Sequence, residues 1–144
     1  ESLPFPLPKR HNLILTRNPK YLAEGGEVFC NVEEILNRAY ELALQDGVDE
    51  IMVIGGGQVY ELFLPICDRV YVTRIQAKVD GDTHFPIFKA GKHWSIIDEQ
   101  PLKKRGADQY RSARKVYERL PNFLSSSTLW ESENLDSNCS KMAV

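Results

Sequence analysis

The chain has 144 residues, which suits one domain of ordinary size, and 42% of them are hydrophobic, enough to fill a core. The formal net charge of −2 excludes a strong general attraction to nucleic acid or to an anionic membrane surface. The three cysteines have the spacing of neither a zinc site nor a redox pair, and the histidines show no ligand spacing. We therefore expect free thiols, a reducing cytoplasmic location and no bound metal, and no apolar stretch is long enough to span a bilayer.

The first half of the chain predicts two short strands and one clear helix. Three prolines within residues 1–8 forbid a regular helix there and predict an extended loop. Short apolar runs predict strands over residues 12–16 and 28–30. Asn31 is predicted to cap a helix with one apolar face, and Gly47 is predicted to end it.

In the second half, helices alternate with buried strands, which predicts an α/β fold with parallel pairing. Strands that follow one another without a helix predict an antiparallel hairpin at the end of the sheet. The predicted elements are a strand at 50–54, a helix at 58–64, and strands at 69–76, 94–98 and 110–120. Residues 121–144 hold six serines and no sustained periodicity, so we predict a disordered tail.

The strongest chemical motif is the run from Ile51 to Tyr60, in which three glycines lie between a buried strand and the start of a helix. Glycine has no Cβ, so its backbone can approach an anion closely, and the N–H groups of a helix start favour negative charge. The run therefore predicts a site for a dinucleotide pyrophosphate. The same glycines also suit a tight turn with a purely steric role, and the run does not match GxGxxG.

Two further motifs carry arginine beside the first strand. Thr16 and Arg17 follow that strand and could hold a phosphate ester at the sheet edge where ligands bind in α/β folds. Arg10 precedes the strand and suits bidentate capture of a carboxylate. Taken singly, both arginines also fit the description of solvated surface charges.

Five segments occur in a characteristic order and spacing. They are Glu1–Pro8, Asn12–Arg17, Ile51–Glu61, Tyr71–Thr73 and Asp80–Pro86. Together they resemble the bacterial dihydrofolate reductase family from Glu1 to about Leu120. The resemblance makes residues 1–120 a domain of that family, incomplete at its N-terminus, and leaves residues 121–144 outside the family pattern.

The resemblance implies a mixed, mainly parallel sheet flanked by helices, with an antiparallel C-terminal hairpin and without the family's first strands and first helix. It implies NADPH-dependent reduction of 7,8-dihydrofolate to tetrahydrofolate. The expected partners are dihydrofolate and antifolate-type small molecules, with no nucleic acid and no membrane. The complete protein is expected to be a monomer.

The resemblance also implies roles for individual residues. The cofactor-binding set is Leu15, Thr16, Arg17, Ile54, Gly55, Gly56, Gly57, Gln58, Val59 and Tyr60. The substrate-binding set is Ser2, Leu3, Leu7, Arg10, Ile54, Tyr60 and Thr73. The family has a cis peptide that would join Gly55 and Gly56, Thr73 would support the catalytic acid, and Asp82 would be structural.

The family's catalytic carboxyl group lies on its first helix, and no acidic residue of this chain matches that motif. We therefore assign no catalytic acid here and expect the chain by itself to be marginally folded and inactive. Two alternatives remain open at this point. One is a non-catalytic nucleotide-binding or assembly module, and the other is a related pyrimidine reductase of riboflavin synthesis.

Overall fold

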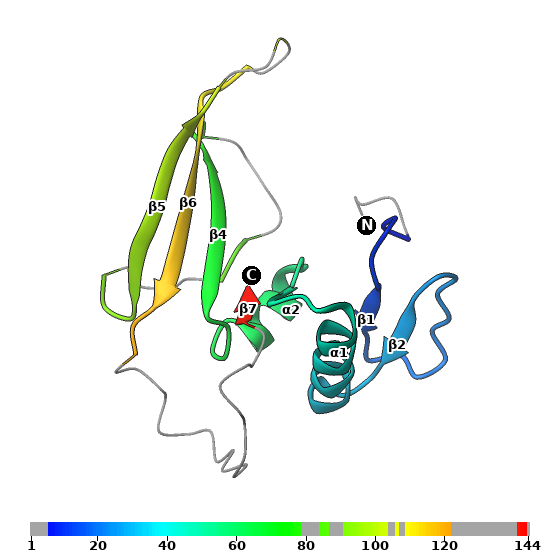
Figure 1. The fold of residues 1–144 in the computed structure, drawn as a ribbon. Coiled ribbons are helices and arrows are strands. Elements are labelled where there is room, and N and C mark those ends of the chain that lie inside the picture. Colours follow the sequence, from blue (N-terminus) through cyan, green and yellow to red (C-terminus); the bar gives the residue numbers. More distant parts are fainter. Residues whose placement is uncertain are drawn as a thin grey trace. The chain divides into compact units, whose positions relative to one another are not determined.

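In the computed structural model, the chain forms two compact units, Glu1–Ile51 and Met52–Val144. The structure describes residues 6–78, 84–86, 91–103, 106, 109–121 and 141–143. Figure 1 shows the ribbon of the chain, coloured along the sequence from blue at the N-terminus to red at the C-terminus.

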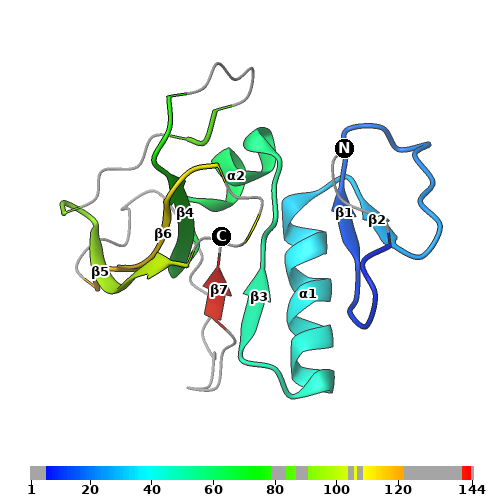
Figure 2. The ribbon, with the colours of Figure 1, turned by 90° about the horizontal axis from the view of Figure 1, so that it is seen from above.

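The first unit is a helix packed on two short strands. Strands β1 (Leu13–Leu15) and β2 (Glu27–Phe29) pair in parallel, with Ile14 opposite Val28. Helix α1 (Val32–Asp46) lies against both strands (Figure 2). Its buried residues recur at helical spacing, which is why one face is removed from water. They are Ile35, Ala39, Leu42 and Ala43.

Both predicted ends of α1 are confirmed. The Asn31 side chain accepts a hydrogen bond of 2.7 Å from the Glu33 N–H. Gly47 follows the helix with a φ of 64°, and its N–H donates to the carbonyls of Ala43 and Leu44. A positive φ is accessible to glycine at little cost, so this residue satisfies helix carbonyls that would otherwise lack donors.

Replacing Asn31 with alanine is expected to lower the free energy of unfolding by about 1 kcal/mol, because the Glu33 N–H loses its acceptor. Urea unfolding followed by circular dichroism measures this change. The matched control is Asn37→Ala at an exposed position inside α1, where alanine should be neutral or slightly stabilising. Equal losses in both variants would contradict a capping role for Asn31.

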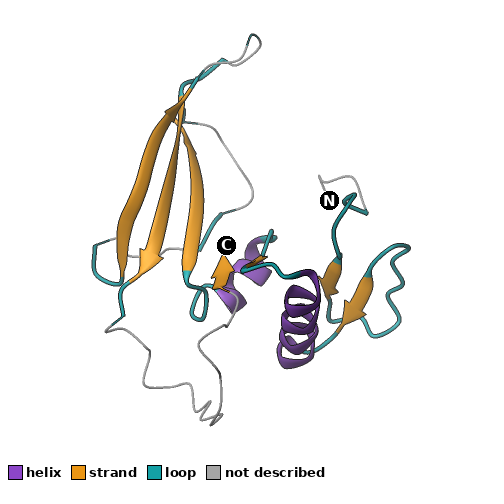
Figure 3. Cartoon of the chain, viewed as in Figure 1, coloured by secondary structure: helices purple, strands orange, loops and turns teal. Residues whose placement is uncertain are grey.

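The second unit is built on a sheet. It contains the end of β3 (Glu50–Met52), then α2 (Gly57–Phe63), β4 (Arg69–Ile75), β5 (Trp94–Leu102), β6 (Ser112–Arg119) and β7 (Lys141–Ala143). The sheet order is β3-β7-β4-β6-β5. Strand β6 is antiparallel to both β4 and β5, whereas β7 is parallel to β4. Figure 3 shows the three long strands side by side.

This arrangement confirms the predicted α/β class, with a mixed sheet and an antiparallel hairpin of β5 and β6. Strand β5 extends four residues beyond the predicted end at Asp98 and includes Pro101. It lies at the end of the sheet order, where a proline removes no hydrogen bond needed by a second neighbour. A register shift between Ile96 and Asp98 interrupts its pairing with β6.

The prediction of a disordered tail is wrong for residues 141–143, which form β7 inside the sheet. Met142 is 2% exposed and Ala143 is fully buried. Residues 122–140 of the predicted tail lie outside the described residues. Within the described segments, neither helix has the length and apolar character that crossing a bilayer requires.

Candidate functional site

The glycine run forms the connection between β3 and α2 in the second unit. The peptide bond between Gly55 and Gly56 is cis, as the family resemblance predicted. Gly56 is the N-cap residue of α2, and its carbonyl accepts a hydrogen bond of 3.0 Å from the Tyr60 N–H. The predicted helix at 58–64 is thus confirmed, with its start one residue earlier and its end at Phe63.

Gly55 occupies a position that excludes a side chain. Its φ is 92°, a conformation that residues with a Cβ rarely adopt. A Cβ built there would lie 2.5 to 2.8 Å from three atoms of the Tyr60 ring. That ring also contacts Phe85, at a centroid separation of 5.0 Å and an interplanar angle of 53°. Burial raises the pKa of the Tyr60 phenol, so the ring carries a neutral hydroxyl over Gly55.

Gly56 differs from its neighbour because it faces open space. No atom lies within 4 Å of the position that a Gly56 Cβ would occupy, and the residue is exposed. A Gly57 Cβ would lie at 3.4 Å from the His84 carbonyl oxygen, which places residues 84–86 beside the turn. The backbone at Gly56 is therefore accessible to an approaching group, as phosphate binding requires.

Three other predicted cofactor residues flank this turn. Ile54 precedes it and is 51% exposed. Gln58 and Val59 lie in the first turn of α2, with Gln58 exposed and Val59 partly buried. The structure thus brings the predicted residues 54–60 together around one strand-to-helix connection.

In the first unit, Leu15, Thr16 and Arg17 lie at the C-terminal end of β1. The Thr16 N–H donates to the Phe29 carbonyl at 2.9 Å, which continues the pairing of β1 with β2. The Thr16 hydroxyl accepts a bond of 3.2 Å from the Asn18 N–H, a side-chain turn that fixes the hydroxyl. Arg17 is exposed.

The Leu7–Arg10 loop lies at the opposite end of β1 and is organised by Asn12, a residue that the sequence did not single out. The Asn12 side chain accepts from the Leu7 N–H and donates to the Leu7 and Arg10 carbonyls, each at 3.0 Å. The Arg10 guanidinium is exposed and donates to the Pro8 carbonyl at 3.1 Å. Asparagine often bonds local backbone in this way, and its place just before a strand was the available signal.

The structure says less about the surroundings of the remaining predicted residues. Thr73 lies in β4, exposed and opposite Arg114 of β6. Ser2, Leu3 and Asp82 lie outside the described residues. Their roles stay predictions.

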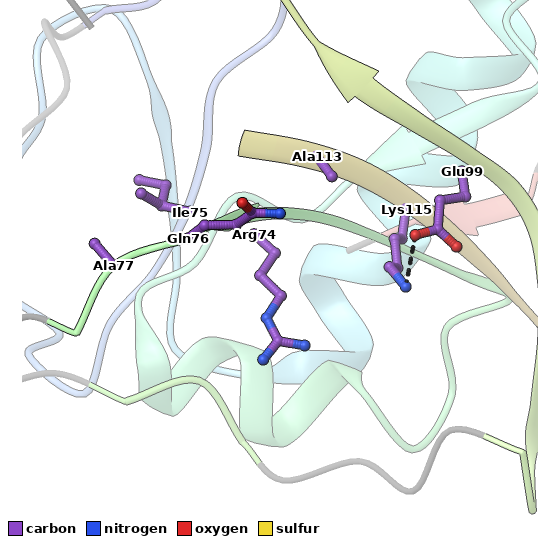
Figure 4. Close-up of a pocket in the computed structure, with 7 residues that line it drawn as sticks. All are labelled: Arg74, Ile75, Gln76, Ala77, Glu99, Ala113 and Lys115. Carbon is purple, nitrogen blue, oxygen red and sulfur yellow. Dashed lines mark ion pairs between the residues drawn. The ribbon is translucent and has the colours of Figure 1, made fainter. Parts of the chain in front are cut away.

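A pocket of about 440 Å³ lies elsewhere on the same sheet (Figure 4). Its lining residues are Arg74, Ile75, Gln76, Ala77, Glu99, Ala113 and Lys115. Lys115 and Glu99 form an ion pair of 2.8 Å across β6 and β5. None of the predicted site residues lines this pocket, so it contributes nothing to the candidate site.

Comparison with known proteins assigns the family. The family model described as dihydrofolate reductase matches residues 1–119. The chain belongs to the dihydrofolate reductase family.

Individual relatives agree with this assignment. Dihydrofolate reductase type 3 of Salmonella typhimurium is 46% identical over 86 residues, which cover 60% of this chain and 49% of that protein. Dihydrofolate reductase of Bacillus subtilis is 31% identical over 119 residues, covering 83% and 67%. A structure of the Enterococcus faecalis enzyme, complexed with NADP(H) and RAB-propyl, matches with a TM-score of 0.63 and 34% identity, covering 79% of this chain and 64% of that one. The chain spans about half to two thirds of the length of these relatives.

Proposed function

We propose that this chain contributes the cofactor-binding turn and part of the folate site of an NADPH-dependent dihydrofolate reductase. The geometry of Gly55 and Gly56 is the observation that carries the proposal. Gly55 has a positive φ and packs against the Tyr60 ring, and the next residue, Gly56, is open to solvent. In a member of this family, such an exposed glycine backbone allows the phosphates of a dinucleotide to approach closely. No observation favours the nucleotide-binding module or the riboflavin-pathway reductase.

The residues present fit NADPH. Gly55 to Val59 would hold the pyrophosphate, because Gly56 has open space where other residues carry a Cβ. The fixed Thr16 hydroxyl and the exposed Arg17 would hold the 2′-phosphate, with Leu15 beside the adenosine. NADPH supplies a hydride when it is bound.

The residues predicted to bind substrate would hold dihydrofolate. Arg10 would pair with the glutamate α-carboxylate of dihydrofolate, and the Asn12 contacts would keep its loop in place. The aminobenzoyl ring would pack on Leu7, together with Ser2 and Leu3. Ile54 and Tyr60 would line the junction of pterin and nicotinamide, and Thr73 would support the proton donor.

Proton delivery is the step for which this chain has no assigned residue. Reduction at the pterin requires a proton at N5 beside the carbon that receives hydride. None of the chain's acidic residues is assigned that role, so we propose nucleotide binding without turnover for the chain by itself. The exposed Cys30 thiol suits a reducing cytoplasm, and we propose that the complete protein works there as a monomer.

Titration of the purified chain with NADPH, followed by nicotinamide fluorescence, tests the proposal. We expect saturable binding and no consumption of NADPH when dihydrofolate is added. Gly56→Ala should weaken NADPH binding about tenfold or more, because a methyl group would fill the space that the phosphates approach. Gly106→Ala serves as the control, because Gly106 also has no atom within 4 Å of its Cβ position and lies between β5 and β6, outside the predicted set of site residues. Turnover by the unsupplemented chain would contradict the assignment of the proton donor, and absence of binding would contradict the function.

A further inference from the structure

The pocket of about 440 Å³ on the sheet of the second unit lies where β4 ends beside the β5–β6 hairpin. Its volume falls within the range of small-molecule sites, roughly 300–1,000 Å³. The lining combines two cations, one carboxylate, one amide and three apolar side chains. In that order they are Arg74 and Lys115, then Glu99, then Gln76, and then Ile75, Ala77 and Ala113. The cations outnumber the carboxylate, so the lining favours a negatively charged ligand.

The register of the strands places both cations of the pocket on one face of the sheet. Arg74 of β4 is directly opposite Ala113 of β6, and Lys115 follows Ala113 by two residues. Side chains alternate along a strand, so Arg74, Ala113 and Lys115 share a face. Figure 4 shows the side chains of Arg74 and Lys115 extending to the same side. Two neighbouring cations raise the local positive potential, which attracts an anion.

Lys115 has a carboxylate partner, whereas Arg74 has none within the described part of the chain. The Lys115 ammonium lies 2.8 Å from a Glu99 carboxylate oxygen. The three other arginines of β4 and β6 also donate to protein acceptors. These pairs are Arg69 with Glu118, Arg114 with Asp98, and Arg119 with the carbonyls of Leu64 and Cys67. Arg74 therefore offers its guanidinium donors to a ligand or to solvent.

The small side chain of Ala113 leaves the space of the pocket open. Ala113 lies in the middle strand of the hairpin region, opposite Arg74 on one side and Pro101 of β5 on the other. A larger residue there would occupy the volume beside the guanidinium. A guanidinium donates two parallel N–H groups to a carboxylate, and the apolar part of the lining suits a hydrocarbon body. Glu99 would repel a second negative charge on the same ligand.

We propose that this pocket binds a small organic monocarboxylate. Arg74 holds the carboxylate with two hydrogen bonds, Lys115 adds a second positive charge, and the ligand's apolar body lies over Ala113. None of these residues belongs to the sites proposed for NADPH and dihydrofolate. The pocket is thus a separate site, and it can be filled whether or not those sites are occupied.

Titration of the unsubstituted chain with benzoate, followed by its amide NMR resonances, locates the site. We expect saturable shifts of the Gln76, Ala77 and Ala113 amides at millimolar benzoate. Benzamide has the same ring without the charge and should cause no such shifts, and inorganic phosphate should bind more weakly than benzoate. Shifts confined to residues around Arg10 or Arg17 would place benzoate in the proposed folate or nucleotide site and overturn the pocket. Equal binding of benzamide would do the same.

A pair of arginine variants tests the role of the unpaired guanidinium. Arg74→Gln should weaken benzoate binding about tenfold or more, because a charge-assisted bidentate contact is lost. Arg114→Gln is the matched control, since it removes one positive charge from the opposite face of the same sheet, where Arg114 lies opposite Thr73. This control should bind benzoate as the parent does. Equal weakening in both variants would show that overall charge alone attracts benzoate, and the proposal would be wrong.

Two further variants keep Arg74 and change its surroundings. Ala113→Leu retains every charge but fills the space beside the guanidinium, so benzoate binding should be lost. Glu99→Gln removes the carboxylate that competes for Lys115 and should strengthen binding about threefold. Unchanged affinity in Ala113→Leu, in a variant whose other amide resonances match the parent, would exclude this pocket as the site. Weaker binding in Glu99→Gln would contradict the proposed competition between Glu99 and the ligand.

Discussion

Replacing Arg119 with methionine is expected to lower the free energy of unfolding by about 3 kcal/mol. The Arg119 guanidinium donates to the Leu64 carbonyl at 2.6 Å and to the Cys67 carbonyl at 2.8 Å. Both carbonyls lie in the turn that links α2 to β4. Methionine would remove the guanidinium donor from each of them and leave the Leu64 carbonyl with the weak donor of the Cys67 thiol, at 3.5 Å. The contact of the guanidinium with the Trp94 ring would be lost as well. Urea unfolding monitored by tryptophan fluorescence measures the loss.

The control for this prediction lies on the same strand. Arg114 forms an exposed ion pair of 2.8 Å with Asp98 across β6 and β5. Exposed pairs contribute little, so Arg114→Met should cost less than about 1 kcal/mol. Arg119→Lys separates charge from shape, since lysine keeps the cation but cannot bond both carbonyls in the same fork geometry. Similar losses for Arg114→Met and Arg119→Met would show that Arg119 acts merely as one more surface charge.

The parts of the structure that the sequence predicted are those determined by neighbouring residues. The spacing of apolar residues in α1, its Asn31 cap and its Gly47 end are all local signals, and each was confirmed. The glycine run likewise marked the connection between β3 and α2. Its cis peptide came from the family resemblance rather than from any local pattern.

The parts that escaped prediction depend on partners far away in the sequence. Strand β7 has three residues, too few to show a periodicity, and its place follows from Val53 and Asp68, which precede it by more than seventy positions. In the sequence, Arg119 is one of several charged residues of β6 and nothing distinguishes it from the others. Its role follows from its hydrogen bonds to the carbonyls of Cys67 and Leu64, which lie 52 and 55 residues away in the sequence. Such contacts leave no local signal in the sequence.

Replacing Gly55 with alanine is expected to have the largest effect in the candidate site, a loss of about 3 kcal/mol in the free energy of unfolding together with loss of NADPH binding. Two costs combine. Alanine at a φ of 92° is strained, and its methyl group would overlap the Tyr60 ring. Phe85 packs against that ring and limits its movement. The turn must therefore change shape, and the proposed phosphate cradle changes with it.

Two further variants separate these costs from each other and from binding. In the double variant Gly55→Ala with Tyr60→Ala, the overlap disappears but the strain at φ 92° remains. The effect of Gly55→Ala should therefore be smaller in that background than beside the intact ring.

Gly56→Ala adds the same methyl group at a position where no atom lies within 4 Å and φ is −72°. The free energy of unfolding of this variant should therefore stay within about 0.5 kcal/mol of the parent value, while NADPH binding weakens. Paired measurements of urea unfolding and NADPH fluorescence distinguish the roles. If Gly56→Ala bound NADPH as tightly as the parent chain, the open face of this turn would not be where the dinucleotide lies, even though Gly55 would still be needed for folding.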